Sequence, residues 1–448
     1  MKLDNIKELL NRSDIKSFIK ESWAVSWPMS MIMFFEFLIN MTDIFIAGKF
    51  GKEVQAAYGV VVQLYFILIV VAISFTVGSV SVISRLFTSN KNNGEFSRAV
   101  LSSTFLSILA GAVLGIFGVI FSQRIIYAMN IPPQLKDLGA PLFKIYCVAV
   151  LFDYFLINTN GILRSCKLIK SSMITMAIVC ALNVILNFCL AFYTPLGFKG
   201  IAWATVISLF VGCVLNSVYI KAFFAKSVRF SLEAIKKMVD IGWPSGLLQI
   251  TWQIGLTVIF LILSKLPENN IETMAAFTNG LRVESGVFLI AFAFNMSNAV
   301  IVGNLLGKEM KEEAFNSGII TAVIGVGVVF VLSMAIAFNA KLISLFLSNN
   351  PIVIRESIKY IYIALLAEPL MAWGVILGGG LSGAGDTKSV MRIALVSVWL
   401  VRIPLSYALV VIFGFNATAV WWSMNASILA QSLLISRRYF KKRWLELA

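Results

Sequence analysis

Acidic and polar side chains recur at helical spacing inside the first long apolar stretch of the sequence. Asp43 lies near the end of the run 27–49, and Asn40 and Glu36 precede it by about one and two helical turns. A carboxylate at membrane depth costs about 2.5–3.5 kcal/mol on insertion scales, so such acids usually mark the path of an ion, a proton or a substrate. Burial also favours the protonated carboxyl. Asp43 is therefore our main candidate for binding a coupling ion; a structural role near the membrane boundary is the alternative.

Two later apolar stretches contain polar residues at similar intervals. Asp153 and Asn160 are seven residues apart, and Asn183 and Asn187 are four residues apart. Residues at these intervals share one face of a helix, so the faces line a polar pocket if they converge on Asp43. A carboxyl group can carry a proton, and carboxylate and amide oxygens also suit Na⁺. The coupling ion, H⁺ or Na⁺, stays open, as does a role for the amides in joining helices.

The elements that must hold these residues are membrane-spanning helices. Of the 448 residues, 59% are hydrophobic and 13% are charged, and windows such as 101–122, 171–198 and 314–340 contain no charged residue. Crossing a hydrocarbon core of about 30 Å takes about 20 helical residues. We count about twelve such stretches. The sequence therefore predicts an all-α polytopic membrane protein with about twelve transmembrane helices.

The net charge of +15 comes from basic residues in particular connections between these stretches. Lys and Arg gather in every second connection, as in 221–237, whereas none occurs between Leu405 and Ser436. By the positive-inside rule, both termini are cytoplasmic and the protein spans the cell inner membrane many times. This distribution indicates contact with a lipid bilayer and argues against nucleic acid as a partner.

Histidine and cysteine usage excludes several kinds of chemistry. The chain has no histidine, which excludes His-based proton relays and Ser-His or Cys-His hydrolase triads. Its five cysteines lie in or beside apolar stretches without paired metal-ligand spacing, which is typical of packing residues. We expect a protein that is not an enzyme and has no cofactor besides its coupling ion.

The two halves of the sequence repeat each other. The offsets between matching residues stay nearly constant in spans and connections alike: Pro28 and Pro244 (216), Lys170 and Lys388 (218), Gly197 and Gly414 (217). Two copies of six spans that enter from the same side form two six-helix lobes, related by a pseudo-two-fold axis along the membrane normal. The expected parts are a cytoplasmic amphipathic segment or helical cap (1–20), an N-terminal lobe (21–224), a linker (225–238), a C-terminal lobe (239–436) and a basic cytoplasmic tail (437–448).

Several segments, by their order and spacing, resemble multidrug and toxic compound extrusion (MATE) transporters. They are Asn40–Gly51, Gln55–Gly59, Asn160–Arg164, Leu281–Ser285, Leu381–Lys388 and Arg402–Pro404. These segments are spread along both halves, so the resemblance extends over nearly the whole chain. The resemblance implies two lobes around a cleft and export of lipophilic, often cationic organic compounds in exchange for H⁺ or Na⁺ by alternating access. We further expect the protein to act as a monomer.

Within the family, the sequence resembles the DinF-like branch more than the NorM branch. The first-lobe cation site of the DinF-like branch maps onto Asp43, Asn160, Asn183, Asn187 and Thr205. Proton-linked members carry an aspartate where this chain has Asn187, and an amide cannot take up a proton. Asp43, Asn183 and Asn187 therefore also form a candidate Na⁺ site, and Glu36 and Asp153 are further candidates for coupling.

The NorM branch places its cation-binding acids on the first and fourth spans of the second lobe. Here these spans offer Gln249, Gln253 and Met371 at the matching places, so we expect that site to be absent. By the repeat offset (371 − 218 = 153), Met371 corresponds to Asp153, so the first lobe has an acid at the equivalent position. Asn40, Gln249, Gln253 and Glu284 are candidate residues of the substrate cleft.

Two other functions compete with drug efflux. A flippase for lipid-linked oligosaccharides, of the same superfamily, is expected to carry cationic side chains in its cleft, and only Arg282 and Arg402 are candidates for this. A membrane-embedded lipid transferase needs acidic metal-binding clusters such as Asp-Asp-x-x-Asp, and none occurs. Glu284 lies two residues from Arg282, and Glu368 lies beside Pro369. For both glutamates, the alternative to a functional role is a structural one, as part of a charge pair or of a hinge.

Overall fold

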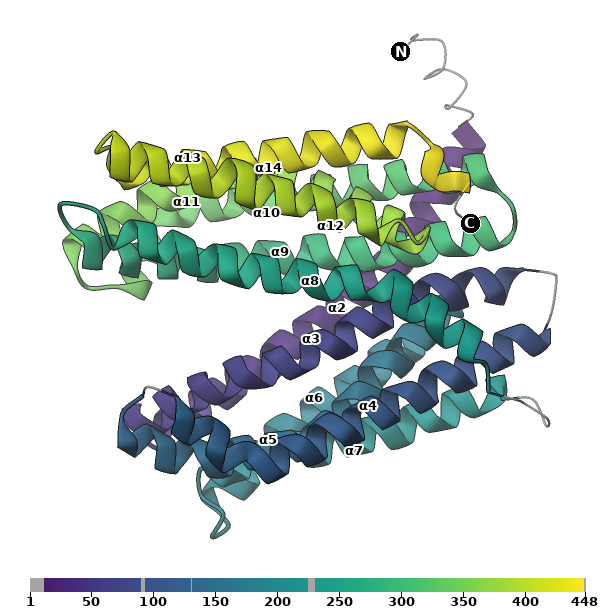
Figure 1. Cartoon of the computed structure of the whole chain (residues 1–448), viewed down its shortest axis with the longest axis horizontal. Coiled ribbons are helices and arrows are strands. Elements are labelled where there is room, and N and C mark those ends of the chain that lie inside the picture. The colour runs from purple at the N-terminus through teal and green to yellow at the C-terminus, as the bar shows by residue number, and fades with distance from the viewer. Residues whose placement is uncertain (1–11, 90–92, 130, 225–229, 447–448) are drawn as a thin grey trace. The chain divides into compact units, whose positions relative to one another are not determined.

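The computed structural model describes residues 12–89, 93–129, 131–224 and 230–446, and all regular elements within these ranges are helical (Figure 1). The first half contains α2 (Arg12–Lys49), α3 (Lys52–Thr88), α4 (Asn93–Ala128), α5 (Pro133–Ser165), α6 (Ile169–Phe192), α7 (Lys199–Ile220) and the short η1 (Lys221–Phe223). The second half contains α8 (Leu232–Leu263), α9 (Asn270–Gly307), α10 (Lys311–Leu347), α11 (Pro351–Gly383), α12 (Thr387–Leu395), η2 (Val396–Arg402), α13 (Ile403–Tyr407), η3 (Ala408–Ile412), α14 (Ala417–Phe440) and η4 (Arg443–Glu446).

The described residues form twelve long helices, because α12, η2, α13 and η3 run on as one helical span over Thr387–Ile412. Eleven of the twelve are long and apolar enough to cross a membrane. The twelfth, α14, has 24 residues, enough for about 36 Å, but its interior includes Ser423, Asn425, Ser427 and Gln431. The predicted all-α architecture with about twelve membrane helices is therefore confirmed.

The chain divides into two compact units, and the division falls inside two helices. Residues 31–246 form one unit (the N-unit), and residues 12–30 together with 247–446 form the other (the C-unit). Each boundary lies two residues beyond a proline, Pro28 of α2 or Pro244 of α8. Proline lacks an N–H group and interrupts the helical hydrogen bonds, which allows a helix to bend.

Hydrogen bonds show how the parts of these two helices that precede the prolines are held. In the C-unit, Ser26 of α2 donates to the Ser297 hydroxyl of α9 at 2.8 Å. In the N-unit, Ser74 of α3 donates to the carbonyl of Gly242 of α8 at 2.7 Å. The contacts therefore divide the chain at other residues than the repeat does. Of the expected terminal segment and linker, residues 1–11 and 225–229 lie outside the described residues, whereas 12–20 belong to α2 and 232–238 to α8.

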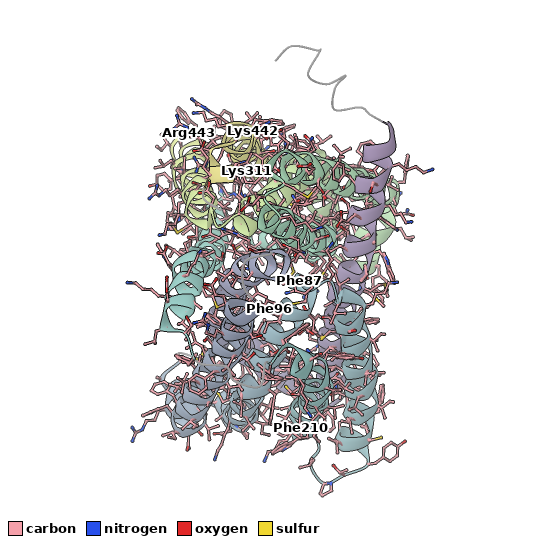
Figure 2. All side chains as sticks on the ribbon, turned by 90° about the vertical axis from the view of Figure 1, so that its right-hand side faces the viewer. Phe87, Phe96, Phe210, Lys311, Lys442 and Arg443 are labelled. Carbon is pink, nitrogen blue, oxygen red and sulfur yellow. The ribbon has the colours of Figure 1, made fainter. Side chains whose placement is uncertain are left out.

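Helix α5 is central in the N-unit, where it packs against α3, α4, α6 and α7. Its buried face includes Phe143, Tyr146 and Cys147, which pack with Tyr58 of α3 and with Ile201 of α7. Helix α3 closes onto α4 through the ring pair of Phe87 and Phe96, whose centroids are 5.7 Å apart (Figure 2). This packing fixes the positions at which α3 and α5 present polar side chains.

In the C-unit, the end of α14 and the short η4 fold back onto α10. Trp444 is fully buried and donates through its ring nitrogen to the Tyr439 carbonyl at 2.8 Å. Lys442 contacts the Glu312 carboxylate at 2.7 Å, and Lys311, Lys442 and Arg443 lie at one end of the unit (Figure 2). The part of the expected tail that follows α14 is therefore packed through Trp444 and Lys442, although Arg437, Lys441 and Arg443 are exposed.

Close backbone contact between α9 and α11 requires glycine at two positions one turn apart. A Cβ atom on Gly379 would lie 2.1 Å from the Asn295 carbonyl oxygen, and one on Gly383 would lie 2.2 Å from the Ala299 carbonyl oxygen. Small residues allow membrane helices to approach in this way. Both partners are main-chain atoms, which cannot rotate away as a side chain can.

We expect Gly383→Ala to lower the thermal stability of the purified protein. Forcing an extra methyl group against the α9 backbone costs about 1–3 kcal/mol. The matched control is Gly286→Ala in α9, where an added Cβ meets no atom within 4 Å. Thermal unfolding in detergent measures both variants. Equal melting temperatures for the two variants would contradict the close contact between α9 and α11.

Candidate functional site

Asp43 lies in the interior of the N-unit and accepts hydrogen bonds from four side chains. It is 2% exposed. Its Oδ1 atom accepts from the Asn187 amide of α6 at 2.7 Å. Its Oδ2 atom accepts from Tyr146 of α5 at 3.2 Å and from Tyr58 of α3 and Thr205 of α7, each at 3.3 Å. Five helices therefore meet at one carboxyl group.

The two asparagines of α6 extend this arrangement into a closed network. The Asn187 Nδ2 atom also donates to Asn183 Oδ1 at 2.9 Å, and Asn183 Nδ2 donates to the Thr205 hydroxyl at 3.3 Å. Asn187 Oδ1 is buried and has no hydrogen-bond partner. The spacing of four residues does place both amides on one face, as the sequence indicates. Their donors suit an ionised Asp43, and one amide oxygen remains as an additional acceptor.

The surroundings of this network are apolar. Near the end of α2, Ile46 and Ala47 are buried in a core with Val54 of α3 and Leu142 of α5. A polar network enclosed by such a core is isolated from water, so its hydrogen bonds matter more than they would at a surface. Any change in the charge of Asp43 must then be met by rearrangement of the same few side chains.

Asn160 belongs to a different network of the N-unit. Its Oδ1 atom accepts from Ser172 of α6 at 2.9 Å and from Asn216 of α7 at 2.8 Å. On α5 it follows Tyr146 by fourteen residues, or about 21 Å of helix, which explains why it does not reach Asp43. Of the residues aligned with the family's first-lobe site, the structure thus brings Asn183, Asn187 and Thr205 to Asp43, but not Asn160.

The other predicted residues of the first stretch are less buried than Asp43. Asn40 is exposed, and its amide donates to the Glu36 carbonyl at 2.9 Å. Glu36 is half-buried and interacts electrostatically with Asp153 and Arg164 of α5. Asp153, also half-buried, accepts from the Tyr65 hydroxyl of α3 at 2.7 Å.

Tyrosines are the part of this site that the sequence reasoning missed. Tyr58 and Tyr146 both donate to Asp43, and Tyr65 donates to Asp153. The spacing in the sequence could have indicated these tyrosines. Tyr58 and Tyr65 are seven residues apart on α3, as are Tyr146 and Asp153 on α5. Two such faces opposite each other bring phenols and carboxyls together.

In the C-unit, the candidate cleft residues do not form one group. Gln249 is half-buried and Gln253 exposed, whereas Met371 is buried in the hydrophobic core. Glu284 interacts electrostatically with Glu368 and Tyr360 of α11 and with Arg402 of η2. These four residues form what we call the C-unit charge cluster. Glu284 thus has Arg402, far away in the sequence, as a charged neighbour.

Burial and pairing in the C-unit charge cluster are uneven. Arg402 is 2% exposed, donates to the Ser427 hydroxyl at 2.8 Å and lies 5.2 Å from the Trp252 ring centre. Glu368 is 4% exposed, and its Oε2 atom has no hydrogen-bond partner. Arg402 thus interacts with Glu284, whereas the charged neighbour of Glu368 is Glu284 itself.

Metal and thiol chemistry find little support among the described residues. Within the described ranges, no group of three or more His, Cys, Asp or Glu side chains could hold a metal ion. All five cysteines are free. Cys166 lies in the connection between α5 and α6, where burial raises the pKa of its thiol well above the ordinary value and keeps it in the unreactive neutral form.

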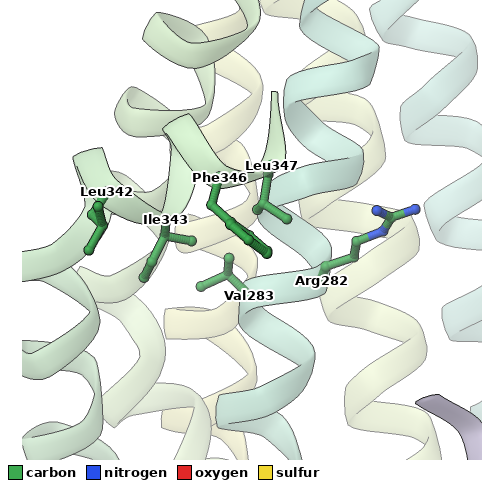
Figure 3. Close-up of a pocket in the computed structure, with 6 residues that line it drawn as sticks. All are labelled: Arg282, Val283, Leu342, Ile343, Phe346 and Leu347. Atoms are coloured by element: carbon green, nitrogen blue, oxygen red, sulfur yellow. The ribbon is translucent and has the colours of Figure 1, made fainter. Parts of the chain in front are cut away.

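An apolar hollow of about 480 Å³ opens in the C-unit between α9 and α10 (Figure 3). It is lined by Val283 and by the last turns of α10, including Leu342 and Phe346. The guanidinium of Arg282 points away from Phe346 (Figure 3). None of the residues that line the hollow belongs to the network of Asp43 or to the C-unit charge cluster, and we do not include it in the candidate site.

Comparisons with known proteins place the chain in a family. A model of the MatE family matches twice, over residues 28–189 and 244–408, and the two matches begin 216 residues apart (244 − 28), as the sequence repeat does. An uncharacterized transporter of Bacillus subtilis, YisQ, is 22% identical over 95% of this chain and 94% of its own length. A probable multidrug resistance protein NorM of Thermotoga maritima is 23% identical, over 99% and 97%.

Solved structures show the same fold. A MOP superfamily transporter from Pyrococcus furiosus superposes with a TM-score of 0.86 at 18% identity, over 96% of this chain and 97% of that one. A family match that covers most of both halves, together with the long apolar helices, leads to one conclusion. The chain belongs to the MatE family and is a multi-pass membrane transporter rather than an enzyme.

Proposed function

We propose that this transporter exports lipophilic, often cationic organic compounds in exchange for H⁺ or Na⁺, and that the exchange depends on occupancy of Asp43. Export of drugs is suggested by relatives named multidrug resistance proteins. The role of Asp43 rests on one observation above all. A deeply buried carboxyl accepts four hydrogen bonds, and beside it the Asn187 amide oxygen is buried without a partner.

A proton on Asp43 would reverse one of these hydrogen bonds. An ionised carboxylate only accepts, whereas a protonated carboxyl must donate one hydrogen bond. Asn187 can meet this change if its amide group turns over, so that Oδ1 accepts from Asp43. The bond from Asn187 to Asn183 is then lost, because both use the same Nδ2 atom. Protonation would thereby change how α2 is held against α6 and α7.

Sodium fits the same place by its donor set. The Asp43 carboxylate, the carbonyl oxygens of Asn183 and Asn187 and the Thr205 hydroxyl are hard oxygen ligands, which suit an alkali cation better than a transition metal. The unpartnered Asn187 oxygen is the atom most readily available for such an ion. Bound Na⁺ would neutralise Asp43 as a proton does, and would draw the same amides into new positions.

The remaining parts of the proposal follow from the sequence. Membership in the DinF-like branch is supported by Asp43 in the first half and by Met371, Gln249 and Gln253 where the NorM branch has acids. We place the protein in the cell inner membrane as a monomer with both termini cytoplasmic. Asn40, Gln249, Gln253 and Glu284 are our candidates for substrate contact. A flippase would need cationic side chains in its cleft, and one of the two candidates, Arg402, is instead buried inside the C-unit.

Transport by purified protein in liposomes tests this function. With an ethidium-like dye inside right-side-out liposomes, we expect efflux when H⁺ or Na⁺ is higher outside, and imposing each gradient alone identifies the coupling ion. Liposomes without a gradient and protein-free liposomes with one are the controls. Dye movement that is the same with and without both gradients would contradict cation-coupled antiport.

A further inference from the structure

Two carboxyl groups of the N-unit are connected through a pair of tyrosines. Tyr146 donates to Asp43 at 3.2 Å, and Tyr65 donates to Asp153 at 2.7 Å. The two phenol rings contact each other, with centroids 5.2 Å apart. The four side chains therefore form a continuous row from Asp43 through Tyr146 and Tyr65 to Asp153.

Helix geometry fixes the length of this row. Tyr146 and Asp153 are seven residues apart on α5, which corresponds to two turns and about 10 Å. Tyr58 and Tyr65 have the same separation on α3, and α3 packs along α5. The pairing of the two helices thus presents a phenol to each carboxyl, one at each end of the row.

The other titratable and charged groups near this row are few. Asp153 faces Glu36 of α2, the Cys213 thiol of α7 and its neighbour Tyr154, besides Tyr65. Glu36 in turn interacts with Arg164 of α5. Around Asp43 the titratable groups are Tyr58 and Tyr146, and the other contacts are the neutral Asn187 and Thr205.

We propose that Asp153 is the second acid of the coupling site, and that Tyr65 and Tyr146 are positioning residues that hold it in line with Asp43. The inference rests on the proposed function of Asp43. With an amide at position 187, the carboxyl in direct contact with Asp43 that a two-acid site would need is missing. Asp153 supplies a negative charge from farther away, across two phenols instead of directly.

The consequence is a coupled titration. If the carboxyl groups of Asp43 and Asp153 are separated by about the same two turns, roughly 10 Å, two unit charges at an effective dielectric constant of about 20 shift each other's proton binding by about one pH unit. An ionised Asp153 therefore makes Asp43 bind a proton at higher pH than it would alone. The Tyr65 hydroxyl stabilises the ionised form of Asp153, and so sustains this effect.

The pH profile of gradient-driven efflux tests the proposal, because a purely structural role of Asp153 would not move it. The part of the profile to compare is the one where Asp43 gains or loses its proton. For H⁺ coupling this is the loss of efflux at high pH, and for Na⁺ coupling it is the loss of efflux at low pH. Asp153→Asn should move this part of the profile to lower pH by about one unit. Tyr65→Phe should move it in the same direction, since Asp153 without its donor is more readily neutralised.

The double variant Tyr65→Phe/Asp153→Asn should shift the profile no further than Asp153→Asn alone, because Tyr65 acts through Asp153. Tyr219→Phe is the matched control. It removes a half-buried phenol of α7 that packs in another cluster of the N-unit, and it should leave the profile in place. Thermal unfolding establishes that each variant is folded.

The outcomes separate this inference from the function on which it rests. If Asp43→Asn is inactive but Asp153→Asn keeps the wild-type profile, Asp153 is not the second acid, although Asp43 still couples transport. Additive shifts in the double variant would overturn the positioning role of Tyr65. If Asp43→Asn transports normally, the proposed function itself fails.

Discussion

Asp43→Asn should reduce gradient-driven dye efflux to the level of protein-free liposomes while leaving the protein folded. Asparagine stays neutral at every working pH, so it cannot bind and release a proton, and it lacks the charge that attracts Na⁺. The fold should persist, because an amide oxygen can still accept from Asn187 and an amide nitrogen can donate to the hydroxyls of Tyr58, Tyr146 and Thr205. Reconstituted protein and a dye efflux assay measure the effect.

The matched control for this variant is Asp137→Asn. Asp137 is an exposed aspartate near the start of α5, and the same substitution there should leave efflux at the wild-type level. Melting temperatures in detergent show whether both variants are folded. Folded Asp43→Asn protein with normal gradient-driven efflux would remove this residue from the coupling mechanism.

Arg402→Met should destabilise the C-unit by about 1–3 kcal/mol, because it removes a buried, charged hydrogen-bond donor. The substitution keeps an unbranched side chain but leaves Glu284 without its cationic neighbour. It also removes the donor to Ser427. Adding Glu284→Gln in the same chain should restore part of the stability, since one buried negative charge is then gone.

Thermal unfolding of the single and double variants measures this prediction. Arg282→Met provides the control, because Arg282 is an exposed arginine of the same unit and its removal should have little effect. An unchanged melting temperature for Arg402→Met would contradict a structural role of the cluster. A double variant less stable than Arg402→Met alone would show that the unbalanced charge of Glu284 is not the reason for the loss of stability.

Part of the site follows from helical periodicity alone. Asn183 and Asn187 lie four residues apart, and both amides do join the network of Asp43. The apolar stretches likewise predict the long helices, because crossing a membrane fixes their length and composition. Such features depend only on neighbours within one helix, and one sequence is enough to show them.

The rest depends on how helices pair, which periodicity does not determine. Asn160 shares a helix with Asp153 but lies too far along α5 to reach Asp43. Glu284 and Arg402 are separated by more than a hundred residues, and nothing in either segment indicates the other. In the sequence alone, Tyr65 cannot be told from an aromatic packing residue; its hydrogen bond to Asp153 is known only once α3 is placed beside α5. Long-range packing thus decides which polar residues act together.

The most direct test of the central claim is the protonation state of Asp43 itself. Infrared difference spectra of protein with isotope-labelled aspartate, with Asp43→Asn as the reference, show whether this carboxyl is neutral or ionised. The account predicts that its signal changes between the two forms within the working pH range, or shifts when Na⁺ is added. A carboxylate that stays ionised throughout that range and does not respond to Na⁺ would contradict it.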